Sequence, residues 1–246
     1  MKPLRFRLLQ AREPDDPVRQ EEHASFAERL GVPTSHIWGG DLLAGQISVE
    51  QVTADVDAVL VGGSGAFGVN DDFPWMRAFI DTLGALADQG FPMFASCYGF
   101  QGLCLALGVD VLPDPDGAEV GTYRLTLTEE GRADPLFGSL PDSFLAQEGH
   151  KDRAIHLPDG CVWMARSERC PYQALRVGET LVYATQFHPE LDDKAQRLRF
   201  SRYFDLYKGI YGEQRALEIL EEMRPTPESN ALLPRFAAML RSSKEG

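Results

Sequence analysis

Apolar residues recur in the first half of the chain as short runs that alternate with longer stretches of helical spacing. The runs that are typical of strands lie at 4–9, 35–38, 56–61 and 91–96. The stretches that repeat at helical intervals lie near 19–30, 49–56, 74–90 and 98–108. Strands that alternate in this way with helices predict a doubly wound α/β fold in three layers, with helices on both faces of a mainly parallel sheet.

The pattern changes after Leu112, where short strands follow one another with turn residues between them. Antiparallel strands added to the sheet are expected at 123–128, 144–147, 162–165, 173–177 and 181–185. After Glu190 the pattern becomes helical, near 195–207, 213–223 and 229–240. We therefore expect a domain of residues 1–191 and a helical C-terminal extension of residues 192–246, which either packs on this domain or forms an interface.

The first apolar run contains two arginines, Arg5 and Arg7, at alternate positions. A strand in the middle of a parallel sheet is usually apolar on both faces, because helices cover both. The run therefore predicts either a position at the end of the sheet or partners for the two guanidinium groups.

Composition and charge exclude several classes of protein. The 246 residues carry a formal net charge of -13, so there is no basic surface to neutralise nucleic-acid phosphates. No apolar run approaches the ~18 residues that span a membrane, and the N-terminus does not resemble a signal peptide. The sequence thus predicts a cytoplasmic protein that binds neither nucleic acid nor membrane.

The four cysteines show no metal-binding spacing. Cys97, Cys104, Cys161 and Cys170 include no C-x-x-C pair, which argues against a zinc cluster and a disulfide framework. We expect no cofactor and no metal. A metal site built from Cys97 with histidines and a carboxylate ranks last among the interpretations, because its ligands lack metal-type spacing.

Cys97 stands where an apolar run turns at once into a helical pattern, which is typical of a nucleophile elbow. Ala95 and Gly99 are small enough to flank such a turn. The positive end of a helix that begins near Tyr98 would favour the thiolate. The alternative is a buried core thiol, since cysteine is often buried.

A second polar group follows the last apolar run, at His188-Pro189-Glu190. Proline disfavours the helical region for the residue before it, and residues i and i+2 of an extended chain share a face. Glu190 can therefore reach the His188 imidazole and orient it. Together with Cys97 these residues have the composition of a nucleophile, base and orienter triad.

A glycine-rich loop at residues 62–68 follows the run at 56–61. Acyl transfer needs N–H donors for the oxyanion, commonly one from the residue after the nucleophile and one from a separate glycine loop. Tyr98 and Gly63 are the candidates for these two donors. A glycine loop could also be a plain turn or a phosphate cradle, although the Walker pattern is absent.

These three stretches, in this order, resemble a class I (triad) glutamine amidotransferase domain of flavodoxin-like fold. Cys97 lies in Ala-Ser-Cys-Tyr-Gly-Phe-Gln, which is similar to the family's Gly-x-Cys-x-Gly-x-Gln, and His-Pro-Glu at 188–190 matches outright. The segment 148–152 resembles the family's Ser-His-Gly-Asp stretch, although glycine and lysine replace usual residues there. The resemblance is greatest to the stand-alone branch related to GMP synthase glutaminase domains.

The resemblance implies Cys97 as nucleophile, His188 as base and Glu190 as orienter. It further implies substrate contacts from Gln101, Gly65 and His150. The expected function is release of ammonia from glutamine through a thioester. Hydrolysis of γ-glutamyl peptides or amides by the same triad, and a non-catalytic regulatory subunit of the same fold, stay open as alternatives. An ammonia-accepting partner protein and a homo-oligomer are the expected assemblies.

Overall fold

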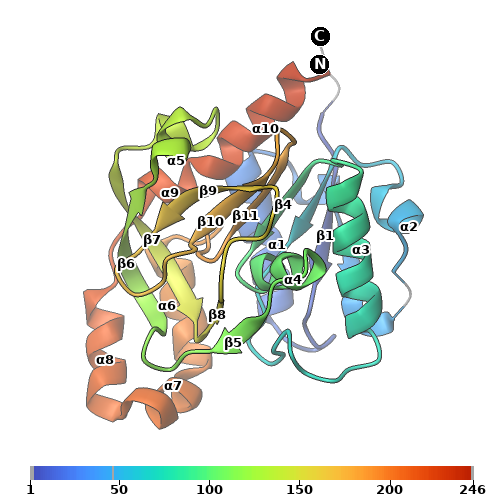
Figure 1. Ribbon diagram of the computed structural model, residues 1–246. Coiled ribbons are helices and arrows are strands. Elements are labelled where there is room, and N and C mark those ends of the chain that lie inside the picture. The colour runs from blue at the N-terminus through green and yellow to red at the C-terminus, as the bar shows by residue number, and fades with distance from the viewer. Residues whose placement is uncertain (1–2, 46, 245–246) are drawn as a thin grey trace.

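The computed structural model describes residues 3–45 and 47–244, and it has a nine-stranded sheet with helices on both faces (Figure 1). The strand order is β2-β1-β3-β4-β11-β10-β9-β6-β7. The five strands from β2 to β11 are parallel, and the pairs from β11 to β7 are antiparallel. The predicted doubly wound, mainly parallel sheet with added antiparallel strands is therefore confirmed.

The parallel strands are β1 (Phe6–Gln10), β2 (Ile37–Asp41), β3 (Ala58–Val61), β4 (Met93–Ser96) and β11 (Val182–Thr185). The antiparallel strands are β6 (Glu119–Leu127), β7 (Ser143–His150), β9 (Cys161–Arg166) and β10 (Ala174–Val177). A small second sheet pairs β5 (Val111–Pro113) with β8 (Asp152–Ala154). The sequence pattern did not predict this second sheet, because three-residue strands are too short to show a period.

Two hydrophobic clusters fill the two sides of the sheet. Neighbouring residues of β3 belong to different clusters, Leu60 to one and Val59 to the other, as the alternation of a strand requires. Helices α1 (Val18–Leu30) and α10 (Leu232–Ser242) cover the first side. Helices α2 (Val49–Thr53), α3 (Met76–Asp88) and α4 (Tyr98–Ala106) cover the second.

Arg7 has a partner on the neighbouring strand. Strand β1 lies between β2 and β3 and not at the end of the sheet, and Arg7 is in register with Trp38. The guanidinium carbons of Arg5 and Arg7 lie 5.6 and 5.4 Å from the centre of the Trp38 ring. Cation–π contact with one indole thus accommodates both arginines.

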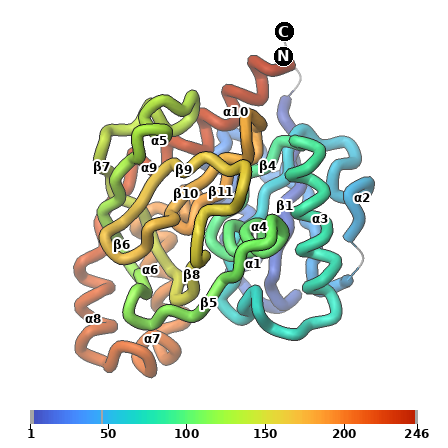
Figure 2. Tube along the Cα trace, in the orientation of Figure 1, coloured from blue at the N-terminus to red at the C-terminus, as the bar shows by residue number. Residues whose placement is uncertain are grey.

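The C-terminal helices are α6 (Asp193–Arg202), α7 (Phe204–Tyr211), α8 (Glu213–Glu222), α9 (Pro227–Asn230) and α10; the remaining helix, α5 (Glu129–Ala133), precedes β7. Several of the C-terminal helices pack on the rest of the fold: α8 contacts β6, α9 contacts β7 and α10 contacts α1. In the Cα trace the red helix α10 passes behind the sheet, where it contacts α1 (Figure 2). Leu232, Leu233 and Phe236 of α10 are fully buried, so their apolar surface belongs to the core.

Among the residues described, no helix has the length and apolar character needed to cross a membrane.

Candidate active site

Cys97 occupies the turn between β4 and α4 with φ 51° and ψ -98°. A positive φ is uncommon for a residue with a Cβ and marks backbone strain that the surroundings must hold. The N–H of Cys97 donates to the carbonyl of Thr185 at 2.8 Å, which ties the turn to the end of β11. This is the geometry of a nucleophile elbow.

The small residues that flank the elbow are needed for close packing. A Cβ on Gly99 would lie 2.7 Å from the Cβ of Val61, so only glycine lets α4 approach β3 this closely. Ala95 is fully buried on the strand below. The expectation of small flanking residues thus has a direct packing reason.

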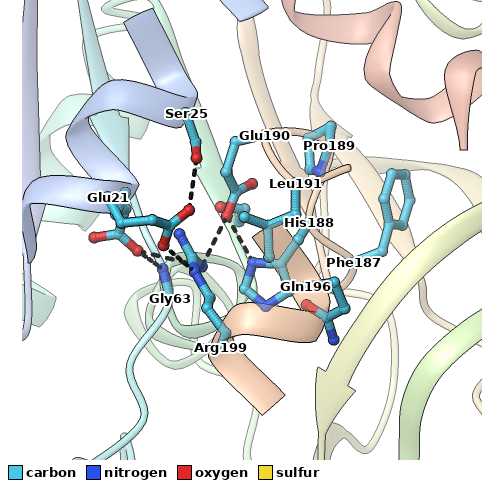
Figure 3. Close-up of polar contacts among 12 residues, drawn as sticks. Glu21, Ser25, Gly63, Phe187, His188, Pro189, Glu190, Leu191, Gln196 and Arg199 are labelled. Carbon is cyan, nitrogen blue, oxygen red and sulfur yellow. Dashed lines mark hydrogen bonds and ion pairs between the residues drawn. The ribbon is translucent and has the colours of Figure 1, made fainter. Parts of the chain in front are cut away.

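His188 and Glu190 are joined by a hydrogen bond of 2.7 Å from the imidazole Nδ1 to a carboxylate oxygen (Figure 3). Both side chains are buried. Burial lowers the pKa of His188, but the charges of Glu190 and Cys97 outweigh it and raise the pKa well above its ordinary value. The structure therefore brings the three predicted residues together, with the imidazole favoured in its protonated form.

Arg199 on α6 is a further charged neighbour of this group. Its Nη1 lies 3.6 Å from Glu190 Oε1, and its Nε donates to Glu21 Oε2 at 2.7 Å (Figure 3). Arg199 is itself buried. The sequence pattern did not identify this arginine, because nothing in its local spacing distinguishes it from the other arginines of the same helix.

Glu22 on α1 forms a hydrogen bond with the glycine-rich loop at residues 62–68. It is fully buried and pairs with Arg12 at 2.8 Å, and its Oε1 accepts the N–H of Gly63 at 3.2 Å. Burial raises the pKa of Glu22, but Arg12 more than offsets this and lowers the pKa to about 2. A lone glutamate on an amphipathic helix carries no sequence signal for such a role.

The Gly63 N–H is therefore already engaged in this structure. Gly63 as an oxyanion donor stays a prediction, and the role would require its bond to Glu22 to open. Among the residues described, the N–H groups of Ser64, Gly65 and Tyr98 have no protein acceptor. Tyr98 begins α4, where the first N–H groups have no partner within the helix.

A cavity of about 650 Å³ opens next to Cys97. The predicted contact residues Gln101, Gly65 and His150 all line it. Gln101 donates to the Asp152 carbonyl at 3.1 Å, which fixes its amide at the wall. The ring of Tyr203 leaves no room for a side chain at Gly65.

His150 lies in a buried cluster with two carboxylates. Its Nε2 is 3.1 Å from Glu119 Oε2 and 3.6 Å from Glu148 Oε2, and candidate ligand atoms of all three residues lie within 4.8 Å of one another. Two carboxylates and an imidazole are a donor set that could hold a divalent metal. Burial, with Glu119 and Cys97 nearby, raises the pKa of Glu148. The protonated form of Glu148 is therefore favoured, and the proton reduces the negative charge of the cluster.

Comparison with known proteins adds sequence and structural relatives. The family described as Glutamine amidotransferase class-I matches residues 43–205. A glutamine-hydrolysing GMP synthase of Thermosipho africanus is 32% identical over 152 residues, which cover 61% of this chain and 28% of that protein. A subunit of the glutamine-hydrolysing GMP synthase of Thermoplasma acidophilum is 27% identical over 150 residues, which cover 59% of this chain and 73% of that one.

The fold has close counterparts among solved structures. A glutamine amidotransferase from Thermotoga maritima has a TM-score of 0.73 at 20% identity and covers 99% of each chain. A glutamine amidotransferase from Methylobacillus flagellatus has a TM-score of 0.72 at 22% identity, and the matched region covers 100% of this chain and 95% of the Methylobacillus chain. At these identities the likeness establishes the shared fold alone.

Proposed function

The chain belongs to the class-I glutamine amidotransferase family, and on that premise we propose that it hydrolyses the side-chain amide of glutamine through a thioester on Cys97. The observation that carries the proposal is the 2.7 Å bond between His188 and Glu190 beside a cysteine on a strained elbow. A thiol, an oriented imidazole and a carboxylate form a unit that splits acyl transfer into two steps.

In the first step the Cys97 sulfur attacks the amide carbon, and the carbonyl electrons move onto oxygen. The N–H of Tyr98 and an N–H of the glycine loop stabilise this oxyanion. The protonated His188 then gives its proton to the departing nitrogen, so that ammonia leaves and a thioester remains. Glu190 keeps the imidazole in the orientation that this transfer needs.

In the second step His188 removes a proton from water, and the hydroxide attacks the thioester carbon. The carbon–sulfur bond breaks, glutamate leaves, and the thiolate regains its imidazolium partner. Each turnover thus consumes one glutamine and one water and yields one glutamate and one ammonia.

The relatives suggest what happens to the ammonia. Two of them are GMP synthase proteins, and the chain spans about 28% of the length of the one from Thermosipho africanus. The one from Thermoplasma acidophilum is named as one subunit of the synthase, which implies a separate second chain. We propose that an ammonia-accepting protein works with this chain, while a homo-oligomer and a cytoplasmic location stay predictions.

The test is release of glutamate from glutamine by the purified full chain. Cys97→Ser should lower turnover at least ~10³-fold, whereas Cys161→Ser, at a thiol outside the cavity, should retain it. Hydroxylamine should divert the thioester to γ-glutamyl hydroxamate, which mass spectrometry detects. Absence of Cys97-dependent glutamate and hydroxamate would rule out the proposed hydrolysis of glutamine and would leave two alternatives, hydrolysis of other γ-glutamyl compounds and the non-catalytic regulatory role.

A further inference from the structure

Helix α7 and the residue before it form one wall of the cavity that contains Cys97. Its lining residues are Tyr203, Leu206, Tyr207, Ile210 and Tyr211. They recur at intervals of three and four, so they make a single stripe on the helix. We call these five residues the α7 wall. The wall lies at and beyond the end of the segment that matches the family, which is residue 205.

The α7 wall carries no charged side chain. The charged residues of the helix, Asp205 and Lys208, do not line the cavity, and Lys208 instead pairs with Glu213 at 2.9 Å. Leu206 and Ile210 are each 44% exposed, although both are large and apolar. Apolar side chains that remain exposed beside a nucleophile favour an apolar ligand surface.

The charged groups of the cavity come from other segments. Lys151, Asp71 and Asp152 line it, and none of the three has an ion-pair partner among the residues that the structure describes. The α-carboxylate and α-ammonium groups of a γ-glutamyl substrate need opposite charges of this kind. The α-carboxylate and α-ammonium groups of the substrate are therefore expected to bind near Lys151 and Asp71. The substituent on the amide nitrogen would then face the α7 wall.

The size of the cavity favours a substrate larger than glutamine. Its volume of about 650 Å³ falls in the range of roughly 300–1,000 Å³ that accommodates drug-sized ligands. Glutamine has only hydrogens on its amide nitrogen, so it would leave the α7 wall in contact with water. An apolar substituent there would bury Leu206 and Ile210.

We infer that the preferred substrate is a γ-glutamyl amide whose amine portion is apolar or aromatic, and that Leu206 and Ile210 determine this preference. The inference rests on the proposed Cys97 chemistry. The same two steps apply: the leaving amine takes the proton from His188, and water releases glutamate from the thioester. Only the leaving group differs, a primary amine in place of ammonia.

The experiment compares kcat/KM for γ-glutamyl benzylamide and glutamine. The wild-type ratio should be at least ~10 in favour of the benzylamide, and Leu206→Asn with Ile210→Asn should reduce this ratio by ~10- to 100-fold. Leu217→Asn is the matched control, because Leu217 is 45% exposed on α8 and does not line the cavity. It should leave the ratio unchanged.

A wild-type ratio below one, or a ratio that the double variant does not change, would overturn the inference while Cys97-dependent glutamine hydrolysis upheld the proposed function. If neither substrate is turned over, calorimetric binding to Cys97→Ala still tests the preference, since it depends on the wall and not on the thiol. Equal loss of both substrates, with a change in sedimentation, would instead assign Leu206 and Ile210 to a protein interface.

Discussion

Arg199 and Glu190 lie 3.6 Å apart, with the arginine on α6 and the carboxylate in the loop before it. The same guanidinium bonds Glu21 and approaches Glu22 to 3.8 Å, so it links α1 to the residue that orients His188. The site proposed for catalysis thus extends past residue 191. The boundary after residue 191 stays a prediction, and it places Glu190 and Arg199, which contact each other, in different segments of the chain.

Replacement of Arg199 should impair turnover more than substrate binding. Arg199→Met should lower kcat by ~10- to 100-fold with little change in KM, because it loosens the carboxylate that orients His188. It should also cost about 3–5 kcal/mol of stability, because buried carboxylates lose their partner. Arg199→Lys should restore part of kcat, and Arg215→Met, at an exposed ion pair on α8, should affect neither quantity. An unchanged kcat in Arg199→Met would contradict the positioning role.

Two glycines that face the His188 ring provide a steric test of its position. A Cβ on Gly63 would lie 2.7 Å from His188 Cε1, whereas one on Gly149 would lie 3.6 Å from Nε2, an ordinary contact distance. Gly63→Ala should displace the imidazole and lower kcat/KM ~100-fold or more, since a shift of about 1 Å can cost this much. Gly149→Ala should retain most of the activity. Similar kinetics for the two variants would mean that the ring is not held where the structure has it.

A diazoketone analogue of glutamine should label Cys97 alone. Burial raises the pKa of Cys161 to about 11 and of Cys170 to about 12, and raises that of Cys104 further. These three thiols are therefore poor nucleophiles at neutral pH. Intact-mass and peptide analysis should find one adduct, and none in Cys97→Ala. Adducts on Cys104 at a comparable rate would contradict the elbow assignment.

Glu22 should contribute stability that depends on pH. Its folded-state pKa of about 2 lies below the unfolded value near 4.5, so the stabilisation is present above about pH 4.5 and is lost as the pH falls toward 2. Glu22→Gln should cost about 3–5 kcal/mol at pH 7, because Arg12 loses its buried partner. Urea unfolding at pH 7 and pH 3 should show a smaller difference between wild type and variant at the lower pH. A difference that stays constant would mean that the pair is not ionic.

The features that sequence predicted well are those set by near neighbours. Proline and i, i+2 geometry place Glu190 against His188, and the run before Cys97 places the thiol at a strand end. The contacts that sequence missed join residues far apart, as Glu22 joins Gly63 and Arg199 joins Glu21. A contact between residues far apart in sequence produces neither a periodic pattern nor a local bias in composition, so the sequence alone does not reveal it. The helical character after residue 192 was predicted, but the expected helices at 195–207 and 229–240 are each divided in two, into α6 and α7 and into α9 and α10. The stripe that faces the cavity depends on where α7 packs.

The pairing of β4 with β11 has a consequence for synthesis of the chain. The edge of β4 that carries Cys97 toward His188 is completed only by β11, which pairs with it in parallel although it comes much later in sequence. Closing a loop of this length is slow and leaves a strand edge open meanwhile. A nascent chain in which β11 and His188 have not yet been synthesised therefore has the cysteine without its base. We expect such a chain to be inert toward glutamine. Synthesis of β11 would supply both the missing partner of β4 and the segment that leads to His188.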